Sequence, residues 1–208
     1  MLWLLLALCL TSVTADPWAR AEELFARTRR LNPTLADYRA TVELKLDARM
    51  GPLTERRTLK GTCYYKREGR HKLDLPDAPS YLQKHSNVFG FSLPRLERYQ
   101  VRKVEEAQLG GQPAWHLELV PRTPQGSIER LEMWLHRKEY TILEYDTYYS
   151  NGQALVGLTH VTVQRQRVPA TISARFEFPG MGLSATVQAA YSGYQFNQGL
   201  SDRLFNAP

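Results

Sequence analysis

The chain has 208 residues, of which 43% are hydrophobic and 23% charged. This composition fits one large all-β domain or at most two small ones, and it excludes collagen, low-complexity disorder and a polytopic membrane protein. The 27 Lys and Arg exceed the 21 Asp and Glu, for a net charge of +6. Because basic residues are scattered among acidic ones through strand-like segments, we expect no nucleic-acid-binding face. Attraction to an anionic membrane surface or to an acidic partner is equally consistent with the charge.

The N-terminus carries an export signal pattern. Residues 1–10 form an almost purely apolar run, too short to span a bilayer, and the small residues Val13, Thr14 and Ala15 follow it. We therefore expect a signal peptide at residues 1–15, cleaved on export, with an uncleaved anchor or a core segment as the alternatives. After cleavage Cys63 would be the single cysteine, so stability would come from the core rather than from an intramolecular disulfide.

One amphipathic helix should form the N-terminus of the mature chain. Asp16 is a helix N-cap residue, Pro17 suits the first helical position, and apolar residues recur at helical spacing as far as Asn32 and Pro33. From Tyr38 to Arg49 apolar and polar residues alternate with a period of two, which predicts a long strand with one solvent-exposed face.

Further strands follow along the rest of the chain. Asn151 and Gly152 predict a tight hairpin turn, and Val168 with Pro169 should separate two strands. The expected strands are at residues 54–66, 71–75, 99–107, 114–120, 128–136, 141–150, 153–166, 171–178 and 183–189. Since no helix interleaves them, residues 16–208 should form a single domain that is mainly β, with one N-terminal helix and one curved antiparallel sheet.

A sheet of this size leaves part of its apolar face uncovered, because a helix of about 15 residues is only roughly 22 Å long. The sheet could wrap on itself, residues 76–98 could cover it, or an apolar ligand could fill it. The residues expected to face inward and line such an apolar cavity are Val42, Leu44, Leu46, Leu73, Leu117, Leu119, Phe176 and Val187.

Three stretches resemble the LolA/LolB superfamily of periplasmic lipoprotein carriers. They are residues 61–70 (GTCYYKREGR), 133–138 (MWLHRK) and 194–205 (YQFNQGLSDRLF). The resemblance covers nearly all of residues 16–208. It implies a half-open LolA-like barrel whose mouth is plugged by helices and whose apolar interior holds acyl chains.

The same resemblance implies a lid. Arg67 matches a family arginine that hydrogen-bonds lid elements and holds the empty cavity shut, and the alternative is a solvated turn arginine beside Glu68. Residues 76–98 contain three prolines and several apolar side chains, so they cannot form a regular strand and should lie across the open mouth. The expected lid and gating residues are Arg67, Tyr81, Leu82, Phe89 and Phe91.

Catalysis is not expected. The five histidines lack close-set ligand spacing and should be surface strand residues, so we expect no metal site. No nucleophile, phosphate-loop or dinucleotide motif is present, and Glu105 and Glu106 are adjacent in a strand, where they point to opposite faces. Cys63 should be a small core residue, and the protein should need no cofactor.

The sequence thus predicts a monomeric, soluble, periplasmic carrier or chaperone that binds the acyl chains of lipoproteins or other lipids for transfer to the outer membrane. A membrane-bound donor and acceptor would be its partners. The alternative is a non-enzymatic envelope sensor that binds lipid or lipoprotein and signals through a protein partner, as the related sigma-factor regulators do.

Overall fold

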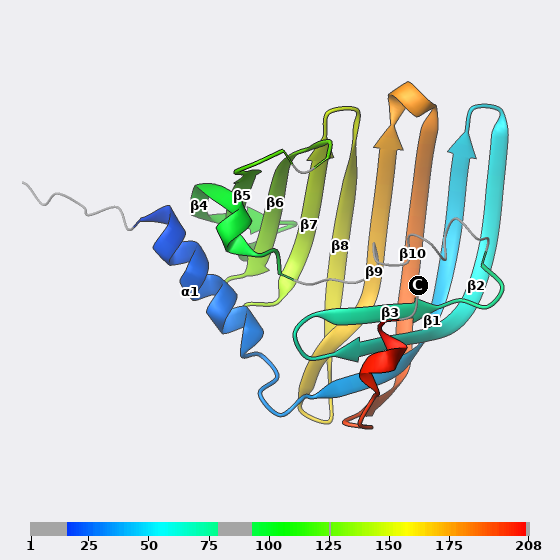
Figure 1. The fold of residues 1–208 in the computed structure, drawn as a ribbon, viewed down its shortest axis with the longest axis horizontal. Coiled ribbons are helices and arrows are strands. Elements are labelled where there is room, and N and C mark those ends of the chain that lie inside the picture. The colour runs from blue at the N-terminus through cyan, green and yellow to red at the C-terminus, as the bar shows by residue number, and fades with distance from the viewer. Residues whose placement is uncertain (1–15, 79–92, 125, 207–208) are drawn as a thin grey trace, which may run out of the picture.

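The computed structural model describes residues 16–78, 93–124 and 126–206. Ten antiparallel strands form one curved sheet in the order β3-β2-β1-β10-β9-β8-β7-β6-β5-β4 (Figure 1). The strands are β1 (Asp37–Met50), β2 (Leu53–Lys66), β3 (Arg70–Asp74), β4 (Tyr99–Leu109), β5 (Gln112–Pro121), β6 (Ile128–His136), β7 (Ile142–Tyr149), β8 (Gly152–Val163), β9 (Gln166–Phe178) and β10 (Leu183–Phe196). The predicted mainly β fold with one curved antiparallel sheet is confirmed.

The α-helix α1 (Pro17–Arg29) precedes the sheet. The Asp16 side chain accepts a hydrogen bond from the Trp18 amide at 3.1 Å, which caps the helix as its sequence predicts. The buried side of α1 consists of Ala21, Leu24 and Phe25. The helix ends at Arg29, before the predicted Asn32 and Pro33, and three-residue 3-10 helices lie at Leu96–Arg98, Pro179–Met181 and Asp202–Leu204.

The sheet is half-open. The first and last long strands pair antiparallel, for example Val42 with Tyr191 and Leu46 with Val187. Within the described residues, β3 and β4 each pair with one strand only and form the two edges. The sheet is therefore curved without closing into a barrel.

One predicted turn is shifted by one residue, and another lies elsewhere. The β7–β8 turn consists of Ser150 and Asn151, and Gly152 pairs with Tyr149. A Cβ atom on Gly152 would lie 2.2 Å from the Glu177 carbonyl oxygen, so this glycine permits close strand approach rather than a turn.

The β8–β9 turn forms at Gln164 and Arg165, both at positive φ, and not at Val168 and Pro169. Pro169 lies inside β9, opposite a register shift between Thr159 and His160. Such irregularities accommodate a proline, which cannot donate to the ladder.

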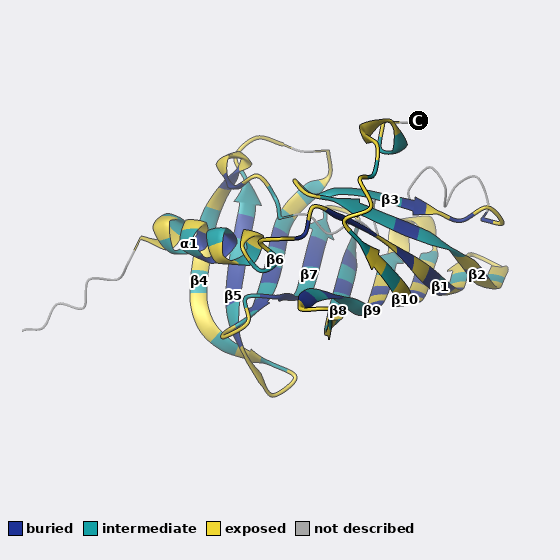
Figure 2. Cartoon of the chain, turned by 90° about the horizontal axis from the view of Figure 1, so that it is seen from below, coloured by how far each residue is buried: buried dark blue, intermediate teal, exposed yellow. Residues whose placement is uncertain are grey.

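β3 and α1 lie on the concave side of the sheet. In Figures 1 and 2, β2 bends so that β3 crosses in front of β9, β10 and β1, while α1 lies toward the β4 end. A Cβ atom on Gly61 would lie 2.0 Å from the Asp74 carbonyl oxygen, so glycine is needed where β3 approaches β2. No helix within the described ranges is long and apolar enough to cross a membrane.

Candidate ligand-binding site

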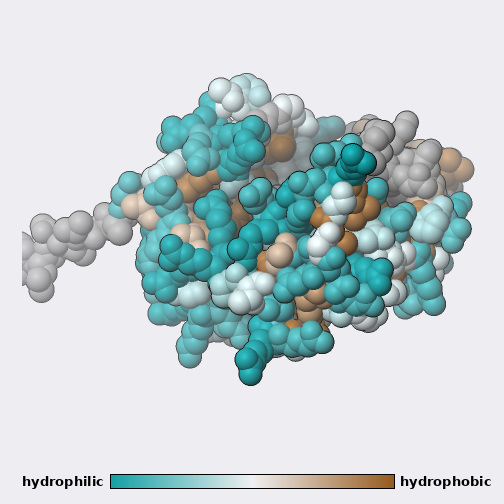
Figure 3. All heavy atoms as spheres, turned by 60° about the horizontal axis from the view of Figure 1, so that its bottom comes forward, coloured by the Kyte–Doolittle hydropathy of each residue, from teal (hydrophilic) through white to brown (hydrophobic). Residues whose placement is uncertain are grey.

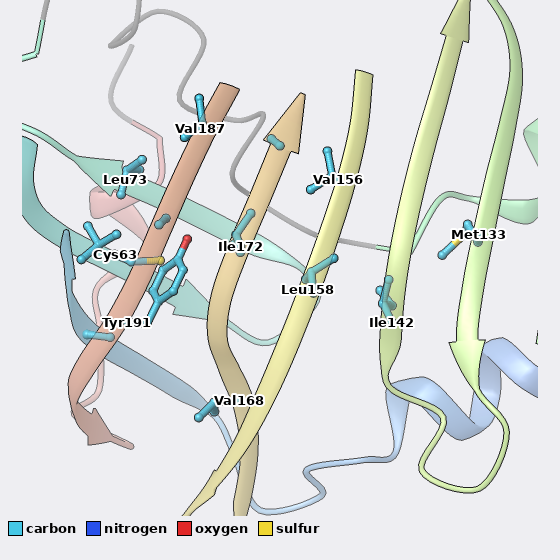
Figure 4. Packing of buried hydrophobic residues seen from close by; sticks show 14 of the residues in the cluster. Cys63, Leu73, Met133, Ile142, Val156, Leu158, Val168, Ile172, Val187 and Tyr191 are labelled. Carbon is cyan, nitrogen blue, oxygen red and sulfur yellow. The ribbon is translucent and has the colours of Figure 1, made fainter. Parts of the chain in front are cut away.

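The eight residues predicted to line a cavity share the concave face. They belong to one hydrophobic cluster, and seven of them are buried while Phe176 is half-buried. Figure 4 shows Leu73 and Val187 within this cluster. Val42, Leu44, Leu117 and Leu119 have no exposed surface. The structure thus brings these residues together, and their contact with a ligand stays a prediction.

A partly open pocket of about 140 Å³ lies between the β1–β3 layer and strands β7 to β10. We call it the mouth pocket. Figure 4 shows Cys63 and Tyr191 beside each other, with Leu158 and Ile172 on the neighbouring strands. The residues that line it are Asn32, Leu35, Tyr38, Cys63, Tyr65, His71, Ile142, Leu158, His160, Arg167, Val168, Pro169, Ile172 and Tyr191.

None of the eight predicted cavity residues lines the mouth pocket. The alternation of inward and outward residues along the strands could have predicted some of the residues that line the pocket. Tyr38 continues the inward phase of Val42, and Ile172 continues that of Phe176. The prediction favoured a different set of aliphatic residues, whereas tyrosines and other aliphatic residues together line the pocket.

Aromatic side chains form one wall of the mouth pocket. The rings of Tyr38 and Tyr65 stack with centroids 5.0 Å apart, and the Tyr194 ring meets Tyr38 edge-on at 5.3 Å. Tyr194 donates its hydroxyl hydrogen to the Pro169 carbonyl oxygen. Burial raises the pKa of Tyr38 well above the ordinary value, so this wall is neutral in the physiological range.

Two other titratable side chains of the pocket, His160 and Cys63, are uncharged at neutral pH. Burial, followed by the positive charge of Arg167, lowers the pKa of His160 to about 4. Burial raises the pKa of the Cys63 thiol to about 12, consistent with the predicted core role of this residue. Arg167 supplies a positive charge, and its guanidinium contacts the Glu139 carboxylate at 2.6 Å. The pocket is therefore mainly apolar with a cationic group at its border.

The α1–β1 loop, residues 30–36, is fastened to β9 beside the pocket. The Asn32 side chain donates to the Arg167 carbonyl oxygen and accepts from the Arg167 amide, both at 2.8 Å. The Gln166 side chain donates to the Thr34 hydroxyl at 2.9 Å. We call these three hydrogen bonds the loop latch.

Arg67 contacts the same loop. It donates to the Leu35 carbonyl at 3.1 Å and the Asn32 carbonyl at 3.3 Å, and also to the Pro33 carbonyl. Its side chain therefore makes specific contacts, although the residue is exposed. The predicted lid residues Tyr81, Leu82, Phe89 and Phe91 lie outside the described residues, as does the expected signal peptide, so the lid and the gating role of Arg67 stay predictions.

His116 differs from the expected surface histidine. It is 8% exposed, stacks on Trp134 with centroids 4.1 Å apart, and lies 3.2 Å from the Glu132 carboxylate. Cross-strand pairing of His116 with Trp134 on the convex face explains this burial. Among the described residues no group of three or more His, Cys, Asp or Glu could hold a metal ion.

A larger groove of about 410 Å³ lies on the outer face of β1, β2 and β10. Its walls include Lys45, Asp47, Arg56 and Gln188. Charged walls disfavour an apolar ligand, so the mouth pocket is the better candidate site.

Solved structures share this architecture. A DUF1329 family protein from Desulfovibrio piger matches with a TM-score of 0.64 and 16% identity over 91% of this chain and 97% of its own. A candidate outer membrane lipoprotein-sorting protein domain from Vibrio parahaemolyticus matches with a TM-score of 0.61 and 16% identity, over 91% and 95%. A LolA superfamily protein from Nitrosomonas europaea matches with a TM-score of 0.51 and 9% identity, over 89% and 96%.

No protein-family model matches the sequence, and no curated protein matches it. At these identities the structural matches define the fold alone. The half-open antiparallel sheet, with α1 and β3 on its concave side, is a LolA-like fold.

Proposed function

We propose that residues 16–208 form a single carrier domain that binds acyl chains between the concave face of the sheet and the elements opposite it, and that performs no chemistry. The observation that carries this proposal is the continuous apolar concave face, which reaches a mainly apolar pocket at one end of the sheet. These mainly apolar walls suit a hydrocarbon chain, because an unpaired buried charge would oppose its entry and the charge of Arg167 is paired with Glu139.

Binding would require the mouth pocket to widen. Its volume of about 140 Å³ is well below the roughly 300–1,000 Å³ of ordinary ligand sites. Apolar burial contributes about 25 cal/mol per Å² of surface, so a long acyl chain needs no specific polar contact once the walls separate. The elements that we expect to move are the α1–β1 loop and Arg67, whose side-chain hydrogen bonds link the two walls.

The proposed setting is the periplasm, reached by cleavage of residues 1–15. The ligand would be the acyl chains of a lipoprotein or of another lipid, carried toward the outer membrane between a membrane-bound donor and acceptor. The LolA-like fold supports this proposal, and one neighbour in fold is a candidate lipoprotein-sorting domain.

Binding of the fluorescent fatty acid cis-parinaric acid tests the proposal. Ile172→Glu places a carboxylate on the pocket wall, at a residue that is 2% exposed, and should abolish the fluorescence increase. Ser173→Glu, on the exposed face of the same strand, is the matched control and should bind normally.

Leu158→Trp is a second test variant, used in case Ile172→Glu does not fold. It fills the pocket without adding charge. It should weaken probe binding at least tenfold while the far-ultraviolet circular dichroism stays unchanged. Normal probe binding by a folded Ile172→Glu or Leu158→Trp variant would overturn the proposed site. Native mass spectrometry of envelope-purified protein would then identify any bound lipid.

A further inference from the structure

Four segments meet at the mouth of the pocket. They are residues 29–36 after α1, the β2–β3 turn (66–70), the β6–β7 turn (137–140) and the β8–β9 turn (164–167). Arg67 joins the second segment to the first, and the Asn32 side chain joins the first to the fourth. Arg167 contacts Glu139 at 2.6 Å, which joins the fourth to the third. The four segments therefore form one continuous surface, which we call the basic rim.

The basic rim carries the whole positive excess of the protein. Its four segments contain nine Lys and Arg but two acidic residues, a net charge of +7, whereas the entire chain has +6. The remaining residues together have a net charge of −1. Charge scattered along the sequence is thus gathered by the fold at one end of the sheet, around the mouth pocket.

Several of these cations face solvent. Arg29, Arg30, Lys138 and Arg165 are exposed, and they come from three different segments. Others already have acidic partners, such as Lys66 and Arg70, which both contact Asp202. Figure 3 shows the end of the molecule that carries these turns, where hydrophilic side chains surround hydrophobic ones.

We propose that the basic rim docks on the anionic surface of a phospholipid membrane, with the mouth pocket turned toward the lipid. Each Lys or Arg near such a surface strengthens binding about fivefold. The attraction extends over a Debye length of about 8 Å at physiological salt, so cations gathered on one end act together and fix the orientation. This inference adds a docking surface to the proposed carrier, but docking itself does not require acyl binding.

Cosedimentation with vesicles tests the docking. The full protein is mixed with vesicles of phosphatidylcholine alone or of phosphatidylcholine with phosphatidylglycerol, at low and at physiological salt. We expect binding to the anionic vesicles that weakens as salt rises. Binding to both vesicle types with equal strength, or to neither, would overturn the proposal.

A pair of matched variants separates orientation from net charge. The rim variant combines Arg30→Gln, Lys138→Gln and Arg165→Gln, and it should lower the partition coefficient on anionic vesicles about a hundredfold. The control combines Lys45→Gln, Arg49→Gln and Arg102→Gln, which removes the same charge from exposed residues outside the rim. Its loss should be tenfold or less. Equal losses in both variants would show that net charge alone drives binding.

The result is independent of the carrier proposal. None of the replaced rim side chains lines the mouth pocket, so the rim variant should bind cis-parinaric acid normally. Vesicle docking without acyl binding would overturn the carrier function and leave the docking surface intact. Retention on immobilised polyglutamate without binding to anionic vesicles would instead identify the rim as a site for an acidic protein, and would overturn membrane docking.

Discussion

Replacing Asn32 by Ala should loosen the α1–β1 loop over the mouth pocket. The Asn32 amide makes two hydrogen bonds of 2.8 Å to the backbone of Arg167, on the opposite wall. Each such bond contributes about 0.5–1.5 kcal/mol, so their joint loss amounts to about 1–3 kcal/mol. If both bonds break when the pocket opens, the opening equilibrium should shift about 5- to 150-fold toward the open state.

Cys63 reports on that opening, because its thiol lines the pocket and is 4% exposed. Burial raises its pKa from 9.0 to about 12. At pH 8 this lowers the thiolate fraction about a thousandfold, and the thiolate is the reactive form. Modification of Cys63 by Ellman's reagent should therefore be slow and limited by the population of the open state.

The assay follows Cys63 modification by peptide mass spectrometry at pH 8. Asn32→Ala should accelerate it by the factor given above, and Asn151→Ala, in the exposed β7–β8 turn, should leave the rate unchanged. Equal rates in Asn32→Ala and the unaltered protein would refute the reasoning, because the loop latch would then not govern access to the pocket. A native Cys63 that reacts as fast as free cysteine would refute it as well.

Two further predictions concern stability. Gly61→Ala should lower the free energy of unfolding, measured with denaturant, by about 1–3 kcal/mol, because the added Cβ atom would meet the Asp74 carbonyl oxygen. Gly180→Ala is the control and should have little effect, because a Cβ atom there meets nothing within 4 Å. Equal effects of the two variants would contradict the close approach of β3 to Gly61. Burial and the Glu144 charge raise the pKa of Asp146 from 3.8 to about 7. Between about pH 4 and pH 7 the folded state therefore holds a proton that the unfolded state has lost, and stability should fall as pH rises through this window. Asp146→Asn should abolish this component of the pH dependence between about pH 4 and pH 7, and an unchanged slope there would show that Asp146 is ionised in the folded protein.

The strands could be predicted because the residue pattern that specifies each of them is local in the sequence. Tyr38 to Arg49 alternates apolar and polar residues, and the structure places the apolar set on the concave face, as the period of two requires. The helix start was equally readable, since Asp16 and Pro17 are adjacent in sequence and act within one turn. The extent of the buried face follows from these patterns without knowledge of distant contacts.

The site could be predicted only in part, because its closure depends on long-range contacts. Asn32 and Arg167 are 135 residues apart, and neither residue type signals the other. The β8–β9 turn lacks the glycine or asparagine that marks left-handed turn residues, so Gln164 and Arg165 gave no turn signal. The burial of His116 required the register that pairs it with Trp134.

We expect the walls of the proposed site to separate at the mouth. Separation of paired strands would break ladder bonds, such as those between β1 and β10, whose register runs without a shift from Thr41 to Met50. At the mouth, the link between the α1–β1 loop and β9 includes the three side-chain hydrogen bonds of the loop latch. Opening there would uncover the apolar walls beside the basic rim. Apolar surface bordered by cations matches the interface of an anionic bilayer, so the proposed membrane docking would place the pocket where an acyl chain could leave lipid without crossing water.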